Sequence, residues 1–282
     1  MNYDHAYHAG NFADVLKHFV LVQIIKSLLK KETGFFYLDT HAGAGFYDLM
    51  SLTQKNKEFS NGIGKILQLN PPAIVKQYTA CVQRINSKLS NSLLASFRYY
   101  PGSPMIVRHF LRPQDRMILT ELHPNVFQQL KAQFGQDNRT HLHLMDGFSA
   151  IKNFLPPKER RGLILIDPPY ERAGELNLAL QALALGLKRF GHGIFALWFP
   201  IKDKPTLDRF YRDITGILTH KALLVELSVY DAISPLHLNG SGMLIVNPPF
   251  QLDQYLIDSL PWLHKTLRMQ GQGEWRIRAL NH

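Results

Sequence analysis

The stretch Arg161-Gly162-Leu163-Ile164-Leu165-Ile166-Asp167-Pro168-Pro169-Tyr170 decides the fold. Its apolar run, residues 162–166, predicts a β-strand, and the acid and two prolines that follow end it. Around this strand the chain alternates between strands and helices. Further strands are expected at residues 35–39, 117–121, 141–145 and 193–198, and helices at 11–31, 124–134, 146–154, 175–190, 204–214 and 252–267. This alternation predicts right-handed crossovers and a mostly parallel sheet in an α/β fold.

Three segments depart from the alternation. Residues 48–100 carry helical patterns at 62–69 and 73–89, which predict a small inserted helical subdomain. One α/β domain would then consist of residues 1–47 and 101–282, with an irregular N-terminal arm at 1–10. Residues 99–104 predict a rigid turn before a short helix. Two late strands, at 223–230 and 242–247, lack a helix between them and predict an antiparallel pair at the sheet edge.

The composition favours a polyanionic partner. The chain has 282 residues, and its 32 Lys and Arg against 22 Asp and Glu give a net charge of +10. Nucleic acid fits this charge first and a membrane surface second, although a merely basic enzyme would look the same. The single Cys81 excludes an internal disulfide framework and a cysteine-rich zinc site. The chain has 13 histidines, but no His-x-x-x-His or Glu-x-x-His pattern lies in a convincing helix, so we expect no metal.

Neither a signal-peptide pattern nor a run of eighteen apolar residues occurs, so we expect a cytoplasmic protein with no membrane attachment. Nothing in the sequence points to an obligate interface, and a monomer is expected.

Features suited to ligand binding follow each of the first four expected strands, where open α/β sheets bind their ligands. The loop Gly43-Ala44-Gly45 allows close approach of the backbone, although it lacks the third glycine of a dinucleotide site. Glu121 can accept hydrogen bonds from ribose hydroxyls, and Asp146-Gly147 can do so from an adenine amino group. Asp167 follows the fourth strand. Each acid alone could be a helix N-cap, but four such features in order predict one site.

The turn Asp167-Pro168-Pro169-Tyr170 suits methylation of an amino group on adenine. That nitrogen is a poor nucleophile because its lone pair is delocalised into the ring. The Asp167 carboxylate and the Pro168 carbonyl can accept hydrogen bonds from its two N–H groups, and Tyr170 offers a face for the base to stack on. Asp167 is therefore the expected catalytic residue, whether it takes a proton or only orients the amino group.

The same pattern occurs again at Asn247-Pro248-Pro249-Phe250. It follows the last expected strand, away from the glycine loop and the acids, so we interpret it as a strand terminator. On the first helix, Asp14, Lys17 and His18 share a face that could line a site. From spacing alone, a solvated face is the favoured interpretation.

With these residues assembled, the chain resembles the family of 23S ribosomal RNA adenine-N6 methyltransferases called RlmJ. The resemblance covers the chain and is carried by residues 8–11, 14–18, 38–45, 99–104, 120–124 and 161–170. It implies a Rossmann-like fold for a methyltransferase that uses S-adenosylmethionine, with a helical insertion. It further implies that the enzyme methylates N6 of an adenine in 23S ribosomal RNA, free or in an early assembly particle.

The resemblance also assigns site residues that spacing does not. It implies cofactor contacts at His18, His41, Ser103, Glu121, Asp146, Gly147 and Asp167. It implies that Tyr3 in the arm contacts RNA, in addition to the stacking expected on Tyr170. His5 and Lys17 are further candidates because they lie close to Tyr3 and His18.

Two alternatives remain open at this point. A DNA adenine-N6 methyltransferase would share the Asp167 turn, although it would usually need a larger recognition domain. A non-catalytic nucleic-acid binding or uptake factor could share the fold, but the intact acids argue against it.

Overall fold

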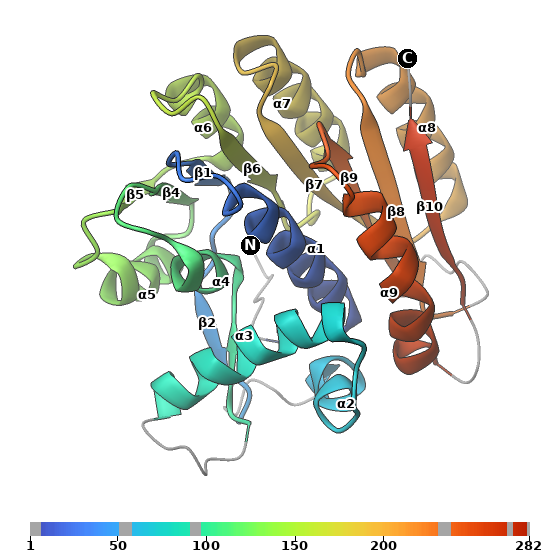
Figure 1. Ribbon diagram of the computed structural model, residues 1–282. Helices are drawn as coiled ribbons and strands as arrows, with labels where there is room; N and C mark the ends of the chain where they lie inside the picture. Colours follow the sequence, from blue (N-terminus) through green and yellow to red (C-terminus); the bar gives the residue numbers. More distant parts are fainter. Residues whose placement is uncertain (1–6, 51–57, 91–96, 231–237, 270–272, 281–282) are drawn as a thin grey trace.

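The computed structural model describes residues 7–50, 58–90, 97–230, 238–269 and 273–280. Its centre is an eight-stranded sheet with the order β10-β8-β9-β7-β6-β1-β4-β5, and helices pack on both faces (Figure 1). The strands are β1 (Phe36–Asp39), β2 (Phe46–Asp48), β3 (Tyr99–Pro101), β4 (Arg116–Glu121), β5 (Thr140–Leu144), β6 (Gly162–Ile166), β7 (Ile194–Ile201), β8 (Ala222–Ser228), β9 (Gly240–Val246) and β10 (Trp275–Leu280). The helices are α1 (Phe12–Leu28), α2 (Ile63–Leu67), α3 (Ala73–Ser90), α4 (Ser103–Phe110), α5 (Pro124–Phe134), α6 (Gly147–Phe154), α7 (Glu175–Arg189), α8 (Lys204–Ile217) and α9 (Leu252–Leu267).

The parallel part of the sheet is doubly wound. The chain moves outward from β1 to β4 and β5, then returns to the other side of β1 for β6 and β7. The predicted α/β, Rossmann-like class is therefore confirmed. The order reverses between β1 and β6, which is where such sheets bind their ligands.

The late strands are antiparallel, as expected, but their predicted place at the edge is wrong. Strand β9 lies between β7 and β8 and is antiparallel to both, while the edge position belongs to β10. All seven residues of β9 are buried, in keeping with an interior strand. The edge strand β10 is half exposed and carries Arg276 and Arg278, and its mixed pattern gave no strand signal.

Two cores lie on the two faces of the sheet. Alternate residues of β1 point to opposite faces, so Tyr37 joins one core and Leu38 the other. The first core includes residues of α1, α3, α4, α5 and α9, and the second includes residues of α6, α7 and α8. Among the described residues, no helix is both long enough and apolar enough to cross a membrane.

The segment between β2 and α4 contains the two helices expected there, α2 and α3. Val75, Tyr78 and Val82 of α3 are buried in the same core as α1. The division into an α/β domain and an inserted subdomain stays a prediction. The expected turn at 99–104 is partly a strand, because β3 pairs with β2 in a small antiparallel sheet. Strands of three residues are too short for a periodic signal.

Candidate active site

The carboxyl ends of the central strands bring the predicted acids to one edge of the sheet. Asp39 ends β1, Glu121 ends β4, and Asp167 directly follows β6. In register, Asp39 lies beside Leu119 of β4 and Leu165 of β6. Asp146 caps α6 by accepting a hydrogen bond from the Ser149 amide at 2.8 Å. These strand-end residues therefore surround the point where the strand order reverses.

A buried ion-pair cluster connects α1 to the end of β6. Lys17 Nζ lies 2.6 Å from Asp167 Oδ2 and 2.8 Å from Asp14 Oδ1, and Asp14 Oδ2 also accepts from the Gly10 amide. The side chains of Lys17 and Asp14 are 6% and 3% exposed. The solvated-face interpretation of this helix face is therefore wrong. Burial alone would lower the pKa of Lys17, but the two carboxylates outweigh it and hold that pKa well above its usual value.

Asp39 is a further buried carboxyl of the site. It accepts hydrogen bonds from Ser103 Oγ and Tyr37 Oη, each at 2.7 Å. Burial raises the pKa of Asp39 to about 6, and the two hydrogen bonds only partly oppose this shift. Ser103, which the resemblance assigned to the cofactor, therefore donates its hydroxyl hydrogen to Asp39. Its contact with a cofactor stays a prediction.

Two histidines implied by the resemblance lie in different environments. The Nδ1 of His18 is 2.7 Å from Tyr100 Oη, which is 2.9 Å from Tyr78 Oη. His41 lies in the loop after β1, with its ring 5.1 Å from that of Phe148 in an edge arrangement. Burial lowers the pKa of His41 to about 4, so its ring is neutral at physiological pH.

Glu121 is held in place by backbone donors. Its Oε2 accepts from the Gly43 amide at 3.0 Å, and its Oε1 accepts from the His123 amide at 2.8 Å. A carboxylate offers about four lone-pair sites, so two remain for the hydroxyls of a ribose. Gly43 and Gly45 both have positive φ values, which lets the loop turn tightly beside this carboxylate.

Gly147 packs against the loop after β1, and we predict that it tolerates no side chain. An added Cβ would lie 1.9 Å from the carbonyl oxygen of Thr40, a backbone atom that cannot rotate away. We expect Gly147→Ala to lower the free energy of unfolding by roughly 1–3 kcal/mol or more, measured by urea denaturation.

Gly216 provides the matched control. It lies in α8, and an added Cβ there meets nothing within 4 Å. Gly216→Ala should raise the free energy of unfolding by about 0.4–1 kcal/mol. Equal stabilities of the two variants would contradict the close approach of Gly147 to Thr40.

Tyr170 ends the turn in an unusual backbone conformation. Its φ of 53° lies in the left-handed region, which is strained for a residue other than glycine. Its hydroxyl donates to the carbonyl oxygen of Trp198 on β7. The ring is therefore fixed beside Asp167, where a base could stack on it.

The near-copy at Asn247 lies at the opposite edge of the sheet. Because β9 runs antiparallel to β7, its end lies beside the start of β7. The Asn247 side chain donates to the carbonyl oxygens of Gly191 and Gly193, at 2.8 and 2.7 Å. Asn247 therefore fixes the loop before β7, in agreement with its interpretation as structural.

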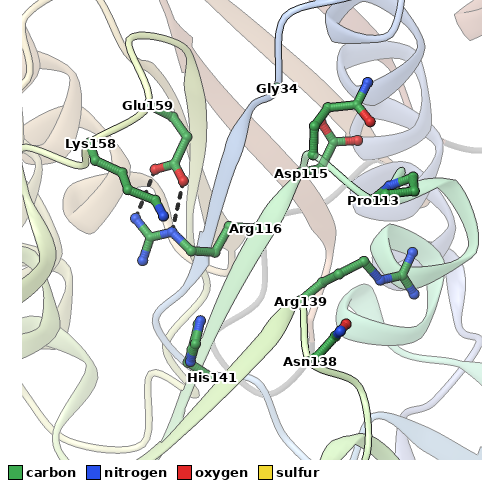
Figure 2. Close-up of a pocket in the computed structure, with 10 residues that line it drawn as sticks. Gly34, Pro113, Asp115, Arg116, Asn138, Arg139, His141, Lys158 and Glu159 are labelled. Atoms are coloured by element: carbon green, nitrogen blue, oxygen red, sulfur yellow. Dashed lines mark hydrogen bonds and ion pairs between the residues drawn. The ribbon is translucent and has the colours of Figure 1, made fainter.

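A cavity of about 500 Å³ also lies at that opposite edge, where β4 and β5 begin. Figure 2 shows Arg116 directed at Glu159, and the pair makes two hydrogen bonds of 2.8 Å. Arg139, on the other side, is paired with Asp137. The main cations of this cavity are thus neutralised, and it lies away from the acids at the strand ends.

Some residues fall outside these observations. Tyr3 and His5 lie outside the described residues, so their contact with RNA stays a prediction.

No group of three His, Cys, Asp or Glu suited to a metal occurs in the part of the chain that the structure describes. Sequence spacing missed the pairing of Lys17 with Asp167, and its one signal was the helix face shared with Asp14.

Comparisons with known proteins agree on one family. The family described as "Ribosomal RNA large subunit methyltransferase D, RlmJ" matches residues 32–280. Ribosomal RNA large subunit methyltransferase J of Haemophilus influenzae is 40% identical over 279 residues, covering 98% of each chain. Its counterpart from Escherichia coli is 42% identical over 275 residues, covering 97% of this chain and 96% of that protein.

A solved structure agrees with these sequence matches. A crystal structure of a Legionella pneumophila protein superposes with a TM-score of 0.86 at 32% identity, covering 96% of this chain and 98% of the other. The chain therefore belongs to the family of ribosomal RNA large subunit methyltransferases J, RlmJ.

Proposed function

We propose that this protein transfers the methyl group of S-adenosylmethionine to the N6 amino group of an adenine in 23S ribosomal RNA. The observation that carries the proposal is the Asp167 carboxylate at the end of β6, held by the buried ammonium of Lys17 at 2.6 Å. Family membership supports the RNA substrate, because both relatives are named as large-subunit ribosomal RNA methyltransferases.

The proposed role of Asp167 is to orient the amino group. Lys17 occupies Oδ2, which leaves Oδ1 and the Pro168 carbonyl as acceptors for the two N–H groups of the target adenine. Asp167 therefore aligns the nitrogen lone pair with the methyl group. As the C–N bond forms, the C–S bond would break and release S-adenosylhomocysteine, and the proton on the cationic nitrogen would then pass to water.

The residues around the strand reversal fit S-adenosylmethionine. When bound, the cofactor supplies an electrophilic methyl group on a positively charged sulfur. Glu121 would accept from its ribose hydroxyls and Asp146 from its adenine amino group, and the backbone of Gly147 would contact the base. His18, His41, Ser103 and Asp167 would complete the binding site on the side of α1 and α4.

The RNA would approach from the same edge of the sheet. Tyr170 would stack on the target base, and Tyr3 would stack on RNA from the N-terminal arm. The net charge of +10 supports binding to a polyanion. We expect a monomer that acts on free 23S RNA or on an early assembly particle.

Methyl transfer from labelled S-adenosylmethionine tests this function. Unmodified 23S RNA is incubated with the protein, digested to nucleosides and analysed by mass spectrometry. We expect N6-methyladenosine in the RNA and little or none in duplex DNA of the same sequence. Equal or better transfer to DNA would favour the DNA alternative and reject the proposed substrate.

A further inference from the structure

Trp198 on β7 lies beside the candidate catalytic residue, although no motif in the sequence singles it out. Ile166 pairs with Leu197, so the next residues along the two strands, Asp167 and Trp198, are level with each other. The indole is 5.7 Å from Lys17 Nζ, measured to the ring centroid. Trp198 therefore stands against the Lys17–Asp167 ion pair on the side of α1.

Two polar groups of Trp198 hold it in place. Its Nε1 donates to Ser241 Oγ at 2.8 Å, and Ser241 is fully buried on β9. Its carbonyl oxygen accepts from the Tyr170 hydroxyl. The indole is nonetheless only partly buried. Lys17 Nζ lies over one face of this ring, so a fixed, partly exposed indole whose N–H is already bonded has its other face to offer a ligand.

The rings of Trp198 and Tyr170 form a corner. Their centroids are 5.5 Å apart and their planes are inclined at 51°. A base between two parallel rings would need about 7 Å, twice the carbon–carbon contact distance of about 3.5 Å. The rings are too close and too inclined for that arrangement, so a base stacked on Tyr170 must meet Trp198 with its edge.

We infer that Trp198 forms the side wall of the adenine pocket and sets the direction in which the base lies on Tyr170. This inference rests on the proposed function. The stack on Tyr170 alone leaves the base free to rotate in its own plane, because stacking has little directional preference. A wall beside Asp167 stops that rotation and keeps the amino group directed at the two acceptors. It also keeps water from the Lys17–Asp167 pair.

The first test observes Trp198 directly. The chain has three tryptophans, so a Trp262→Phe/Trp275→Phe variant leaves Trp198 as the only one. Its fluorescence is titrated with adenosine 5′-monophosphate as the probe. We expect a saturable loss of emission. The control is a Trp198→Phe/Trp262→Phe variant, which reports from Trp275 on the edge strand β10 and should not respond. Unchanged emission from Trp198 across the titration overturns the inference.

The second test distinguishes a Trp198 side chain that contacts the target base from one that only stabilises the fold. Trp198→Ala should lower kcat/KM for RNA by about tenfold or more, with KM for S-adenosylmethionine unchanged, because one base contact of this kind is worth about 1–3 kcal/mol. Trp198→Phe restores a flat wall and should recover most of the loss, whereas Trp275→Phe should behave as wild type.

The outcomes distinguish this inference from the proposed function. If the wild-type protein makes no N6-methyladenosine in RNA, the proposed function fails and this inference fails with it. If the wild-type protein is active and Trp198→Ala has the same kcat and KM, only the inference is overturned.

Discussion

Asp167→Asn is expected to lower kcat for methyl transfer by about 10³-fold, with S-adenosylmethionine still bound. The substitution preserves shape but changes one oxygen to an NH₂ group. The remaining side-chain oxygen must face Lys17, because its ammonium is only a donor and lies 2.6 Å from Oδ2. The NH₂ group is then presented to the adenine amino group, so a donor faces a donor. Loss of one such preorganised contact typically lowers kcat by about 10²–10³-fold.

Two controls accompany this variant. Asp167→Glu keeps the charge but moves the carboxylate by about 1 Å, which should lower kcat by about 10²-fold. Asn247→Ala alters the near-copy at the opposite edge, where the side chain bonds Gly191 and Gly193. It should leave kcat unchanged while lowering stability by about 1–3 kcal/mol, since the carbonyls of the partly exposed Gly191 and the buried Gly193 lose their donor. Turnover close to wild type in Asp167→Asn would reject the assigned role, and calorimetry with S-adenosylmethionine checks that binding survives.

The position of the site could be predicted from the sequence because it follows from strand ends. An acid directly after a buried strand must lie at the carboxyl edge of a parallel sheet, whatever the details of packing. Glu121 ends such a strand and Asp167 follows one, and the structure places both at that edge. The place of the late strands could not be predicted in this way, because the order β7-β9-β8 depends on which strand is buried on both faces.

The partners within the site could not be predicted from spacing. Asp14 and Lys17 are three residues apart on a helix, the same pattern as an ordinary surface ion pair. What distinguishes them is Asp167, which is 150 residues further along the chain. The place of Trp198 beside the site could not be predicted for a different reason, because an aromatic residue in an apolar strand predicts a core position. Its role is inferred only from its distances to Lys17 and Tyr170.

Lys17→Met is expected to destabilise the protein by about 3–5 kcal/mol at neutral pH, because it leaves two buried carboxylates without their cation. Asp14 and Asp167 have side chains that are 3% and 14% exposed, so water has little access to either carboxylate. The matched control is Lys26→Met on the same helix, which should change stability by less than about 0.5 kcal/mol.

The pH dependence of Lys17→Met gives the sharper test of this cluster. Without the ammonium, the folded variant holds two negative charges that have lost their cation, and this cost disappears when the carboxyls are neutral. The unfolded chain does not carry this cost, so it lowers the free energy of unfolding only at the pH values where the carboxyls are ionised. The deficit of Lys17→Met should therefore shrink as pH falls and the carboxyls take up protons. Adding Asp14→Asn to Lys17→Met should recover part of the stability at neutral pH. Urea denaturation between about pH 4 and pH 8, the range over which buried carboxyls titrate, measures both effects. A deficit independent of pH would mean that Lys17 acts through packing, and that it is not the charge that holds Asp167 for catalysis.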